Sequence, residues 1–188
     1  MTEENPLPIE WAYMNALTPI ILSQVEGCIV DLGMGLSTKV LSKHAQDFGR
    51  TQYSVDSDFR TSEWGKSPDI THDKHIIVCQ KVTQFMSTFD DTPAVVLHDS
   101  SHKARKVFQE VLFFLDKLAP GGVIFIHDTC PMEGYYERKL EKKGREMDTY
   151  KARHMLEKRD DVDVLTFRQG CGLCIVLKKD PNEPFYRQ

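Results

Sequence analysis

Short apolar runs alternate with stretches of helical length along the first two thirds of the chain. The runs are six to eight residues long and rich in β-branched residues, as expected for strands. This alternation is typical of an α/β fold, in which parallel strands joined by helices form a right-handed, doubly wound sheet. We therefore predict a Rossmann-like, mostly parallel sheet. The runs cover residues 27–32, 51–56, 75–80, 93–99 and 121–128.

The segments between and after these runs predict the helices and the end of the sheet. In residues 37–49 and 102–122 the apolar positions recur at helical spacing, and the second stretch ends in Pro-Gly-Gly, a common helix stop. A strongly charged stretch from about residue 135 to 158 predicts a further helix with a solvated face. Residues 162–167 and 171–177 are apolar runs joined by a short link that contains glycine. They predict a hairpin, and so an antiparallel C-terminal strand.

Length and composition fit one globular domain. The chain has 188 residues, of which 40% are hydrophobic, and it shows neither an internal repeat nor a low-complexity linker. We expect a single domain over residues 1–188, with a helical N-terminal cover over residues 1–25 and the Rossmann-like core over residues 26–178.

Charge and hydropathy narrow the classes of partner. The net charge of -4 gives no general attraction to nucleic acid or to anionic lipid, and the sequence holds no run of roughly 20 apolar residues that could span a bilayer. We expect a cytoplasmic protein with neither nucleic acid nor membrane as a partner. The sequence leaves the oligomeric state open, including a homodimer.

The cysteines favour a reducing compartment. There are five, an odd number spread along the chain, which argues against a framework of disulfides. Cys171 and Cys174 form a close pair within a predicted strand, where residues three apart face opposite sides. We therefore interpret both as packing residues, since they could share a ligand only if the strand breaks at Gly172.

A glycine-rich loop, "VDLGMGLST", follows the first predicted strand. Gly33 and Gly35 permit a tight turn and the close approach of a ligand, and the amides at the start of the next helix favour a negative group. A nicotinamide-dependent dehydrogenase would need a third glycine at the position of Thr38. Asp31 would repel a pyrophosphate but would attract the ammonium group of an amino acid, as in S-adenosylmethionine. This disfavours the dehydrogenase, although an ordinary tight turn bordered by surface acids remains an alternative.

The second predicted strand ends in a further acid. Asp56 lies about 20 residues beyond the loop, where an acid commonly accepts hydrogen bonds from both hydroxyls of a ribose.

Four segments together carry a resemblance to a known family. In chain order they are "VDLGMGLST", "YSVDSD", "VVLHDSSH" and "LAPGGVIFIHDT", and with this spacing residues 26–178 resemble the class I S-adenosylmethionine-dependent methyltransferases. Within that superfamily the later segments are similar to small-molecule O-methyltransferases of the catechol and macrolide-sugar type and to their cephalosporin-hydroxylase relatives. The resemblance implies methyl transfer to a hydroxyl group of a small-molecule substrate. It also implies a cofactor site made of Asp31, Gly33, Gly35, Ser37, Thr38, Asp56 and Asp99.

The same resemblance implies a metal site and a catalytic base. Carried over by position, Asp99, His127 and Asp128 would hold Mg²⁺ or Mn²⁺, while His102 and Asp99 would be catalytic. The chain departs from the family where Ser100 replaces a glycine and His127 stands at the place of an acid.

The residues support such a cluster without the resemblance. His98, Asp99 and His102 follow one predicted strand and His127 and Asp128 follow another, so we expect all five at the edge of the sheet that carries the glycine loop. A metal there would lower the pKa of a substrate hydroxyl, and a neutral histidine can accept its proton.

Other interpretations stay open at this point. In a purely structural interpretation, Asp99 only caps the helix that begins near Ser101, and His127 is a hydrogen-bonded residue at the end of a strand. A metal-dependent hydrolase or oxygenase could use the same cluster without a methyl donor, and a non-catalytic binding module could share the fold.

Overall fold

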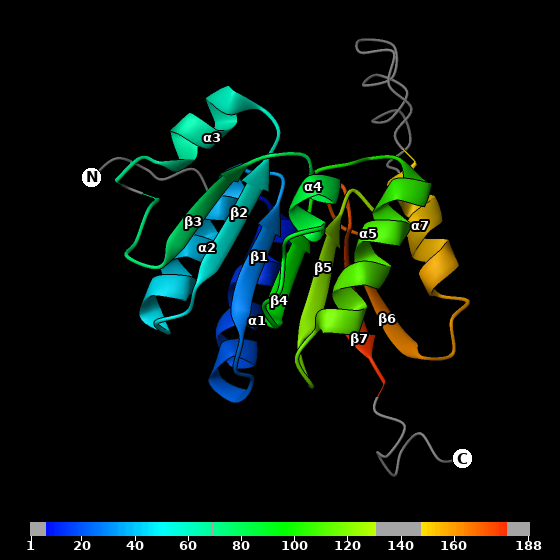
Figure 1. Ribbon diagram of the computed structural model, residues 1–188. Helices are drawn as coiled ribbons and strands as arrows, with labels where there is room; N and C mark the ends of the chain where they lie inside the picture. Colours follow the sequence, from blue (N-terminus) through cyan, green and yellow to red (C-terminus); the bar gives the residue numbers. More distant parts are fainter. Residues whose placement is uncertain (1–6, 69, 131–147, 180–188) are drawn as a thin grey trace.

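The computed structural model describes residues 7–68, 70–130 and 148–179. They form a seven-stranded sheet covered by helices on both faces (Figure 1). No helix within these residues is long and apolar enough to cross a membrane. The elements in chain order are α1 (Ile9–Gln24), β1 (Cys28–Leu32), α2 (Leu36–Asp47), β2 (Gln52–Asp56), α3 (Phe59–Gly65), β3 (His75–Cys79), α4 (Val82–Met86), β4 (Pro93–His98), α5 (Ala104–Lys117), β5 (Val123–His127), α7 (Thr149–Leu156), β6 (Val162–Phe167) and β7 (Leu173–Lys178).

The strands lie in the order β3-β2-β1-β4-β5-β7-β6. Strands β1 to β5 pair in parallel, whereas β7 runs antiparallel to both of its neighbours. The predicted Rossmann-like sheet with an antiparallel C-terminal strand is therefore confirmed. The order of the strands reverses between β1 and β4, and in such sheets ligands bind at this point, beyond the carboxyl ends of the strands.

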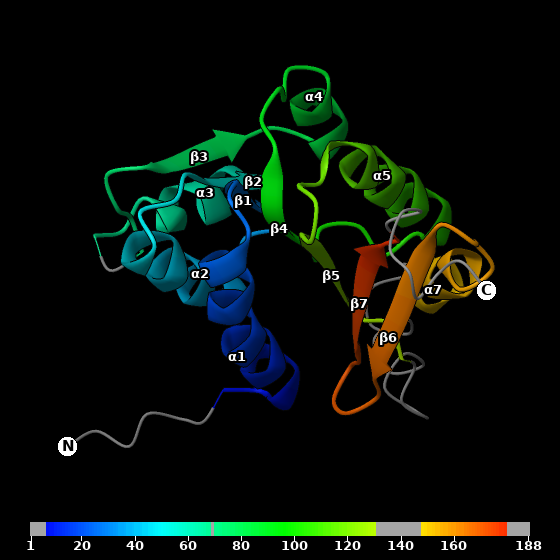
Figure 2. The ribbon, with the colours of Figure 1, turned by 90° about the horizontal axis from the view of Figure 1, so that it is seen from below.

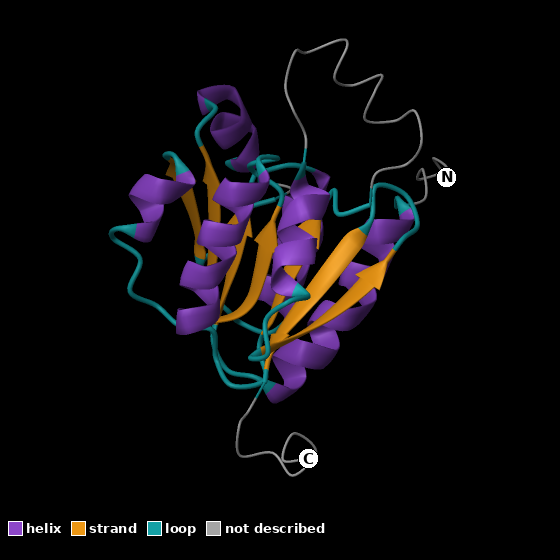
Figure 3. Cartoon of the chain, turned by 90° about the vertical axis from the view of Figure 1, so that its right-hand side faces the viewer, coloured by secondary structure: helices purple, strands orange, loops and turns teal. Residues whose placement is uncertain are grey.

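Each face of the sheet has its own hydrophobic core. On one face, Trp11 and Met14 of α1 and Leu41 of α2 pack against buried strand residues. On the other face the core includes Phe114 of α5 and Leu156 of α7. Figure 2 shows these helices on opposite sides of the sheet, and Figure 3 shows helices on both of its faces. The strands are buried from both sides, which explains why their sequences are continuous apolar runs rather than alternating ones.

The prediction of one continuous charged helix from about residue 135 to 158 is wrong. Asp148 is not helical, with φ of -132°, and α7 begins only at Thr149. The backbone N–H of Asp148 donates to the carbonyl of His102 (2.8 Å), and its carboxylate accepts from the N–H of Ala104 (2.6 Å). These tertiary hydrogen bonds replace the local ones that would continue a helix. The part of the prediction over residues 135–147 lies outside the described residues.

The loops that follow β1 and β4 touch at Gly33. This glycine has φ of +97°, and a Cβ on it would lie 2.4 Å from the carbonyl oxygen of Asp99. Next to it, the N–H of Asp99 donates to the carbonyl of Leu32 (2.8 Å). Only a residue without a side chain fits here, so the two loops are held against each other at the point where the strand order reverses.

Replacing Gly33 is expected to destabilise the fold. In Gly33→Ala the added methyl group meets backbone atoms that cannot move independently, and the positive φ adds strain. We expect a loss of at least roughly 2 kcal/mol in the free energy of unfolding, measured by urea denaturation. Gly35→Ala is the matched control, because its φ is -173° and a Cβ would meet no atom within 4 Å. It should cost less than about 1 kcal/mol, and equal losses in both variants would contradict the role of Gly33.

Candidate functional site

A cavity of about 150 Å³ lies at the carboxyl ends of β1, β2 and β4. It opens where the order of the strands reverses, as expected for a ligand site on this fold. The glycine loop, the acid that ends β2 and the acid that follows β4 all border it. Its lining residues are Gly33, Met34, Val55, Asp56, Ser57, Gln80, Lys81, Val82, Asp99, Ser100 and Lys106.

Asp31 lies beneath the glycine loop rather than in the cavity. Its side chain is fully buried, and its Oδ2 accepts hydrogen bonds from the hydroxyls of Thr38 (2.6 Å) and Ser54 (3.2 Å). The Thr38 hydroxyl in turn accepts from the N–H of Gly35 (2.9 Å). Asp31 and Thr38 therefore fix the shape of the loop. The sequence had suggested a different role for Asp31, a direct contact with the ligand. That contact stays a prediction.

The environment of Asp31 changes its ionisation. Burial raises the pKa of this carboxyl from 3.8 to about 7, although the hydrogen bonds from Thr38 and Ser54 act in the opposite direction. The Oδ1 atom is buried and has no hydrogen-bond partner among the described residues. A cationic ligand near the loop would compensate for this buried carboxylate.

The structure leaves open space above Gly35. This residue begins α2 with an extended backbone that any residue can adopt, and a Cβ would meet nothing within 4 Å. The protein itself therefore does not require a glycine here. A ligand that binds the backbone N–H groups of the first turn of α2 would require a glycine at position 35, because a side chain would occupy its space. Ser37, the next predicted residue, is buried in that turn.

Asp56 connects the end of β2 to the glycine loop. Its Oδ2 accepts from the N–H of Met34 (3.1 Å), and its Oδ1 accepts from the N–H of Asp58 (2.7 Å). The carboxylate is half-buried at the edge of the cavity. It lies where a bound ribose would meet an acid in this fold.

A second group of polar side chains gathers beyond β4 and β5. The Nε2 of His102 lies 2.8 Å from Oδ2 of Asp128 and 3.9 Å from Oδ1 of Asp99. The Nδ1 of His127 lies 3.1 Å from Oδ1 of Asp99 and 3.6 Å from Oδ1 of Asp128. The predicted clustering of these four residues is confirmed. His98 does not join them, because successive strand residues face opposite sides, and its ring is buried against Glu110 of α5 (2.7 Å).

Asp99 does not cap the helix after β4. Helix α5 begins at Ala104, and the carboxylate that accepts from its first N–H belongs to Asp148. Asp99 instead lies between the cavity and the two histidines, about a quarter exposed. The interpretation of Asp99 as a helix cap is therefore wrong.

Candidate metal ligands within the described residues form two sets. In the first, Asp99, His102 and Asp128 each offer one ligand atom, all within 4.8 Å of one another. In the second, Glu10, His127 and Cys171 do the same. The sequence-based set had placed His127, and not His102, with the two acids.

His127 is held in place from several sides. The indole of Trp11 stacks on its ring at 4.4 Å between centroids. Burial lowers the pKa of the imidazole, but the hydrogen bond to Asp99 and the charges of Asp99, Asp128 and Glu10 outweigh burial, so the pKa lies above 6.5. Sequence reasoning missed Glu10, because a glutamate in the first turn of a helix is ordinary. Trp11 lies both in the hydrophobic core and against this site.

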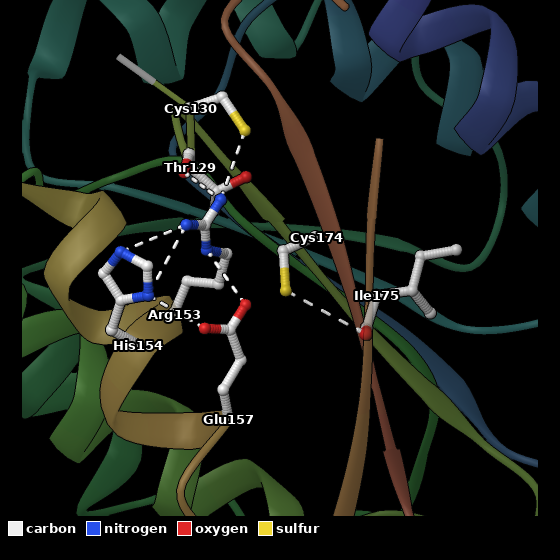
Figure 4. A network of polar contacts seen from close by, with 7 residues as sticks. All are labelled: Thr129, Cys130, Arg153, His154, Glu157, Cys174 and Ile175. Atoms are coloured by element: carbon white, nitrogen blue, oxygen red, sulfur yellow. Dashed lines mark hydrogen bonds and ion pairs between the residues drawn. The ribbon is translucent and has the colours of Figure 1, made fainter. Parts of the chain in front are cut away.

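Arg153 of α7 supports the loop that carries Asp128 (Figure 4). Its guanidinium donates to the carbonyl of Thr129 (3.2 Å) and lies 3.3 Å from the sulfur of Cys130. Asp128 has φ of +58°, which is unusual for a residue with a side chain. The buried arginine therefore stabilises a strained turn from below, although the sequence had indicated only a solvated helix face here.

A family model shows to which family the chain belongs. A family model described as a methyltransferase domain matches residues 30–129. No curated protein matches the chain. Among solved structures, the chain is similar to a Podospora anserina methyltransferase with bound SAH (TM-score 0.70, 14% identity, 92% of this chain and 79% of that one).

Other solved structures that are similar to this chain are named as methyltransferases with different substrates. A Staphylococcus aureus protein named as a caffeoyl-CoA O-methyltransferase has a TM-score of 0.72 and 12% identity, over 94% of this chain and 86% of that one. An rRNA methylase from Streptococcus thermophilus has a TM-score of 0.60 and 13% identity, over 96% of this chain and all of that one (100%). At such identities the likeness shows the fold.

Asp31 is expected to make stability depend on pH. In the unfolded chain its carboxyl ionises near pH 3.8, whereas in the folded protein it ionises near pH 7. Between these values the unfolded state binds fewer protons, so the free energy of unfolding falls as the pH rises and levels off above about pH 7. Asp31→Asn can still accept from Thr38 and Ser54 but does not ionise. Its stability relative to wild type should therefore rise over this range, by roughly 2–4 kcal/mol.

Urea denaturation between about pH 5 and 8 measures this difference. Asp160→Asn, which changes an exposed acid, should follow the wild type at every pH. A constant difference between Asp31→Asn and wild type would show that Asp31 is already ionised in the folded protein at acidic pH.

Proposed function

The chain belongs to the methyltransferase-domain family, and we propose that it transfers a methyl group from S-adenosylmethionine to a hydroxyl group of a small molecule. One observation carries the proposal. The cavity lined by Gly33, Asp56 and Asp99 adjoins a histidine–aspartate pair, because Nε2 of His102 lies 3.9 Å from Oδ1 of Asp99 and 2.8 Å from Oδ2 of Asp128. Such a site can bind a methyl donor and deprotonate an acceptor beside it.

The donor would lie across the ends of β1 and β2. Its amino-acid part would meet the amides of the glycine loop above Asp31, and its ribose would meet Asp56. The carboxylates of Asp31, Asp56 and Asp99 lie near one another at this edge of the sheet, and they would suit the positive charge of a sulfonium. The SAH-bound structure of the Podospora relative supports this choice of donor.

His102 is proposed as the base. Its Nε2 lies within hydrogen-bond distance of the buried Asp128, so a neutral ring would carry its proton on Nε2 and present Nδ1 to the acceptor. Nδ1 would take the hydroxyl proton as the oxygen attacks the methyl carbon. The new O–C bond forms while the S–C bond breaks, and the electron pair stays on sulfur as the neutral thioether. Asp128 would stabilise the imidazolium that results.

The acidic cluster also fits a divalent cation. Two carboxylates and one imidazole suit Mg²⁺ or Mn²⁺, and the geometry favours Asp99, His102 and Asp128 as ligands. In that arrangement His102 would bind the cation through Nε2 and would not act as the base, so the cation and the histidine base are alternative ways to activate the acceptor. The set of Asp99, His127 and Asp128 remains the sequence-based prediction. A bound cation would lower the pKa of the acceptor hydroxyl and orient it.

The acceptor class is the least constrained part of the proposal. The net charge of -4 argues against nucleic acid, whereas the fold is shared with rRNA methylases. The rival function, a metal-dependent hydrolase or oxygenase, would use the same cluster without a donor. It predicts that S-adenosylhomocysteine does not bind.

Donor binding is the first test of this function. In calorimetry, S-adenosylhomocysteine should bind the wild type, and Asp56→Ala should weaken binding about tenfold or more through loss of a charged hydrogen-bond acceptor. Gly35→Ala should weaken it at least as much, because its methyl group enters the ligand space while the fold stays intact. Asp160→Asn should bind like the wild type. Full affinity in both site variants would contradict the proposed position of the donor.

A chelator tests whether methyl transfer depends on a bound metal or on His102 as the base. With a catechol or sugar acceptor found by screening, a chelator should reduce methyl transfer while donor affinity stays nearly unchanged, and Mg²⁺ or Mn²⁺ should restore it. Asp99→Asn and Asp128→Asn should remain slow after the metal is added back. If the chelator has no effect and His102→Ala still abolishes transfer, the reaction depends on the histidine–aspartate pair without a metal.

A further inference from the structure

Three parts of the chain that are distant in sequence meet beside the proposed active site. Glu10 lies in the first turn of α1, His127 ends β5, and Cys171 precedes β7. One ligand atom from each lies within 4.8 Å of the other two, and Oε1 of Glu10 is 3.6 Å from Nε2 of His127. A carboxylate, an imidazole and a thiol thus converge at one point.

The orientation of His127 directs a nitrogen lone pair toward this point. Its Nδ1 lies 3.1 Å from Asp99, so this carboxylate holds the ring proton on Nδ1. The other nitrogen, Nε2, is buried and makes no hydrogen bond within the described residues. Trp11 stacks on the ring and limits its rotation. Histidines that ligate metals commonly donate their second N–H to a carboxylate in this way.

Glu10 is buried although it is an acid. Only 7% of its surface is exposed. Among the described residues it forms an ion pair with His127, but its Oε1 lies 3.6 Å from Nε2 of the ring, which is too far for a hydrogen bond. A Cβ on Gly170 would lie 2.2 Å from Oε2 of Glu10, so the carboxylate rests directly on the backbone of the turn before β7. A buried carboxylate in such a position needs a close cation.

Cys171 faces this site because the strand does not extend through Gly172. That glycine has φ of +82°, and β7 begins only at Leu173. The carbonyl of Cys171 accepts from the N–H of Cys130 (3.0 Å), which fixes the turn against the end of β5. Cys171 and Cys174 therefore lie in different surroundings, and Cys174 is buried in the core on the α5 and α7 side. The interpretation of Cys171 as a packing residue assumed a continuous strand.

We propose that Glu10, His127 and Cys171 bind a zinc ion that joins the N-terminal helix to the β6–β7 hairpin. Oxygen, nitrogen and sulfur ligands together suit Zn²⁺, whereas a thiolate disfavours Mg²⁺. Ligand bonds of about 2.0–2.3 Å in a tetrahedral site place ligand atoms roughly 3.3–3.8 Å apart. The 3.6 Å between Oε1 of Glu10 and Nε2 of His127 lies in this range, and the ligand atom of Cys171 lies within 4.8 Å of those of the other two residues. The fourth position would hold water.

This zinc site is separate from the cation proposed for methyl transfer. It uses Nε2 of His127, whereas the cluster of Asp99, His102 and Asp128 lies on the Nδ1 side of the ring. The two sites touch only through the hydrogen bond between His127 and Asp99. The inference does not depend on the reaction that the protein catalyses.

Metal titration of the purified full-length chain tests the proposal. After treatment with a chelator, one equivalent of Zn²⁺ should bind and raise the melting temperature, and Co²⁺ should give the absorption band of a cobalt–thiolate bond. Cys171→Ser and Glu10→Gln should each weaken Zn²⁺ binding at least about 100-fold and remove the rise in melting temperature. Cys79→Ser, a change at an exposed cysteine, should behave like the wild type.

The outcomes distinguish the two metal sets. Cys171 is only partly buried, so Cys171→Ser should fold even if Glu10→Gln does not, and near-ultraviolet circular dichroism checks this. Zinc binding that survives in a folded Cys171→Ser but is lost in Asp128→Asn would assign the ion to the acidic cluster and overturn the proposal. Absence of a stoichiometric zinc ion in the wild type, or of the cobalt–thiolate band, would overturn it as well.

Discussion

The contact between Gly33 and the backbone of Asp99 is the constraint on which the site depends. It brings the loop after β1 within van der Waals distance of the loop after β4, and it leaves no room for a side chain between them. The glycine loop, which would hold the donor, and Asp99, which would border the acceptor, are therefore held in one fixed arrangement. Their relative position does not depend on flexible side chains, which is what an in-line transfer between two bound molecules requires.

Buried polar side chains on both faces of the sheet hold this unit in place. On one side Asp31 and Thr38 fix the glycine loop from below. On the other, Arg153 holds the turn beyond β5, where Asp128 adopts a strained backbone. Strain of this kind persists only when the surrounding structure enforces it, and it is common at functional sites. The cost in stability is offset by the large apolar cores on both faces.

His127 links the cluster of Asp99, His102 and Asp128 to helix α1 and to the turn before β7. One of its nitrogens faces Asp99 and the other faces Glu10, while Trp11 covers its ring. Helix α1 and the turn before β7 therefore complete the surroundings of a residue that ends a central strand. The N-terminal helix is thus part of the site's structure and not only a cover for one face of the sheet.

The sequence by itself determined the fold and the chemical types of the candidate residues. Periodicity of apolar residues is local information, so the strands, the antiparallel β7 and the glycine loop followed from it, as did the gathering of Asp99, His102 and Asp128 at one edge. Tertiary structure alone decided which atoms meet.

Asp31 lies beneath its loop because hydroxyls from α2 and β2 donate hydrogen bonds to one of its oxygens there. The helix expected from about residue 135 to 158 does not continue through Asp148, because the carboxylate of Asp148 accepts a hydrogen bond from the first N–H of α5. The packing of α1 and the turn at Gly172 place Glu10 and Cys171 next to His127. Glu10 lies more than 100 positions before both of the other residues. Such contacts depend on burial and on the whole topology, and no local pattern in the sequence encodes them.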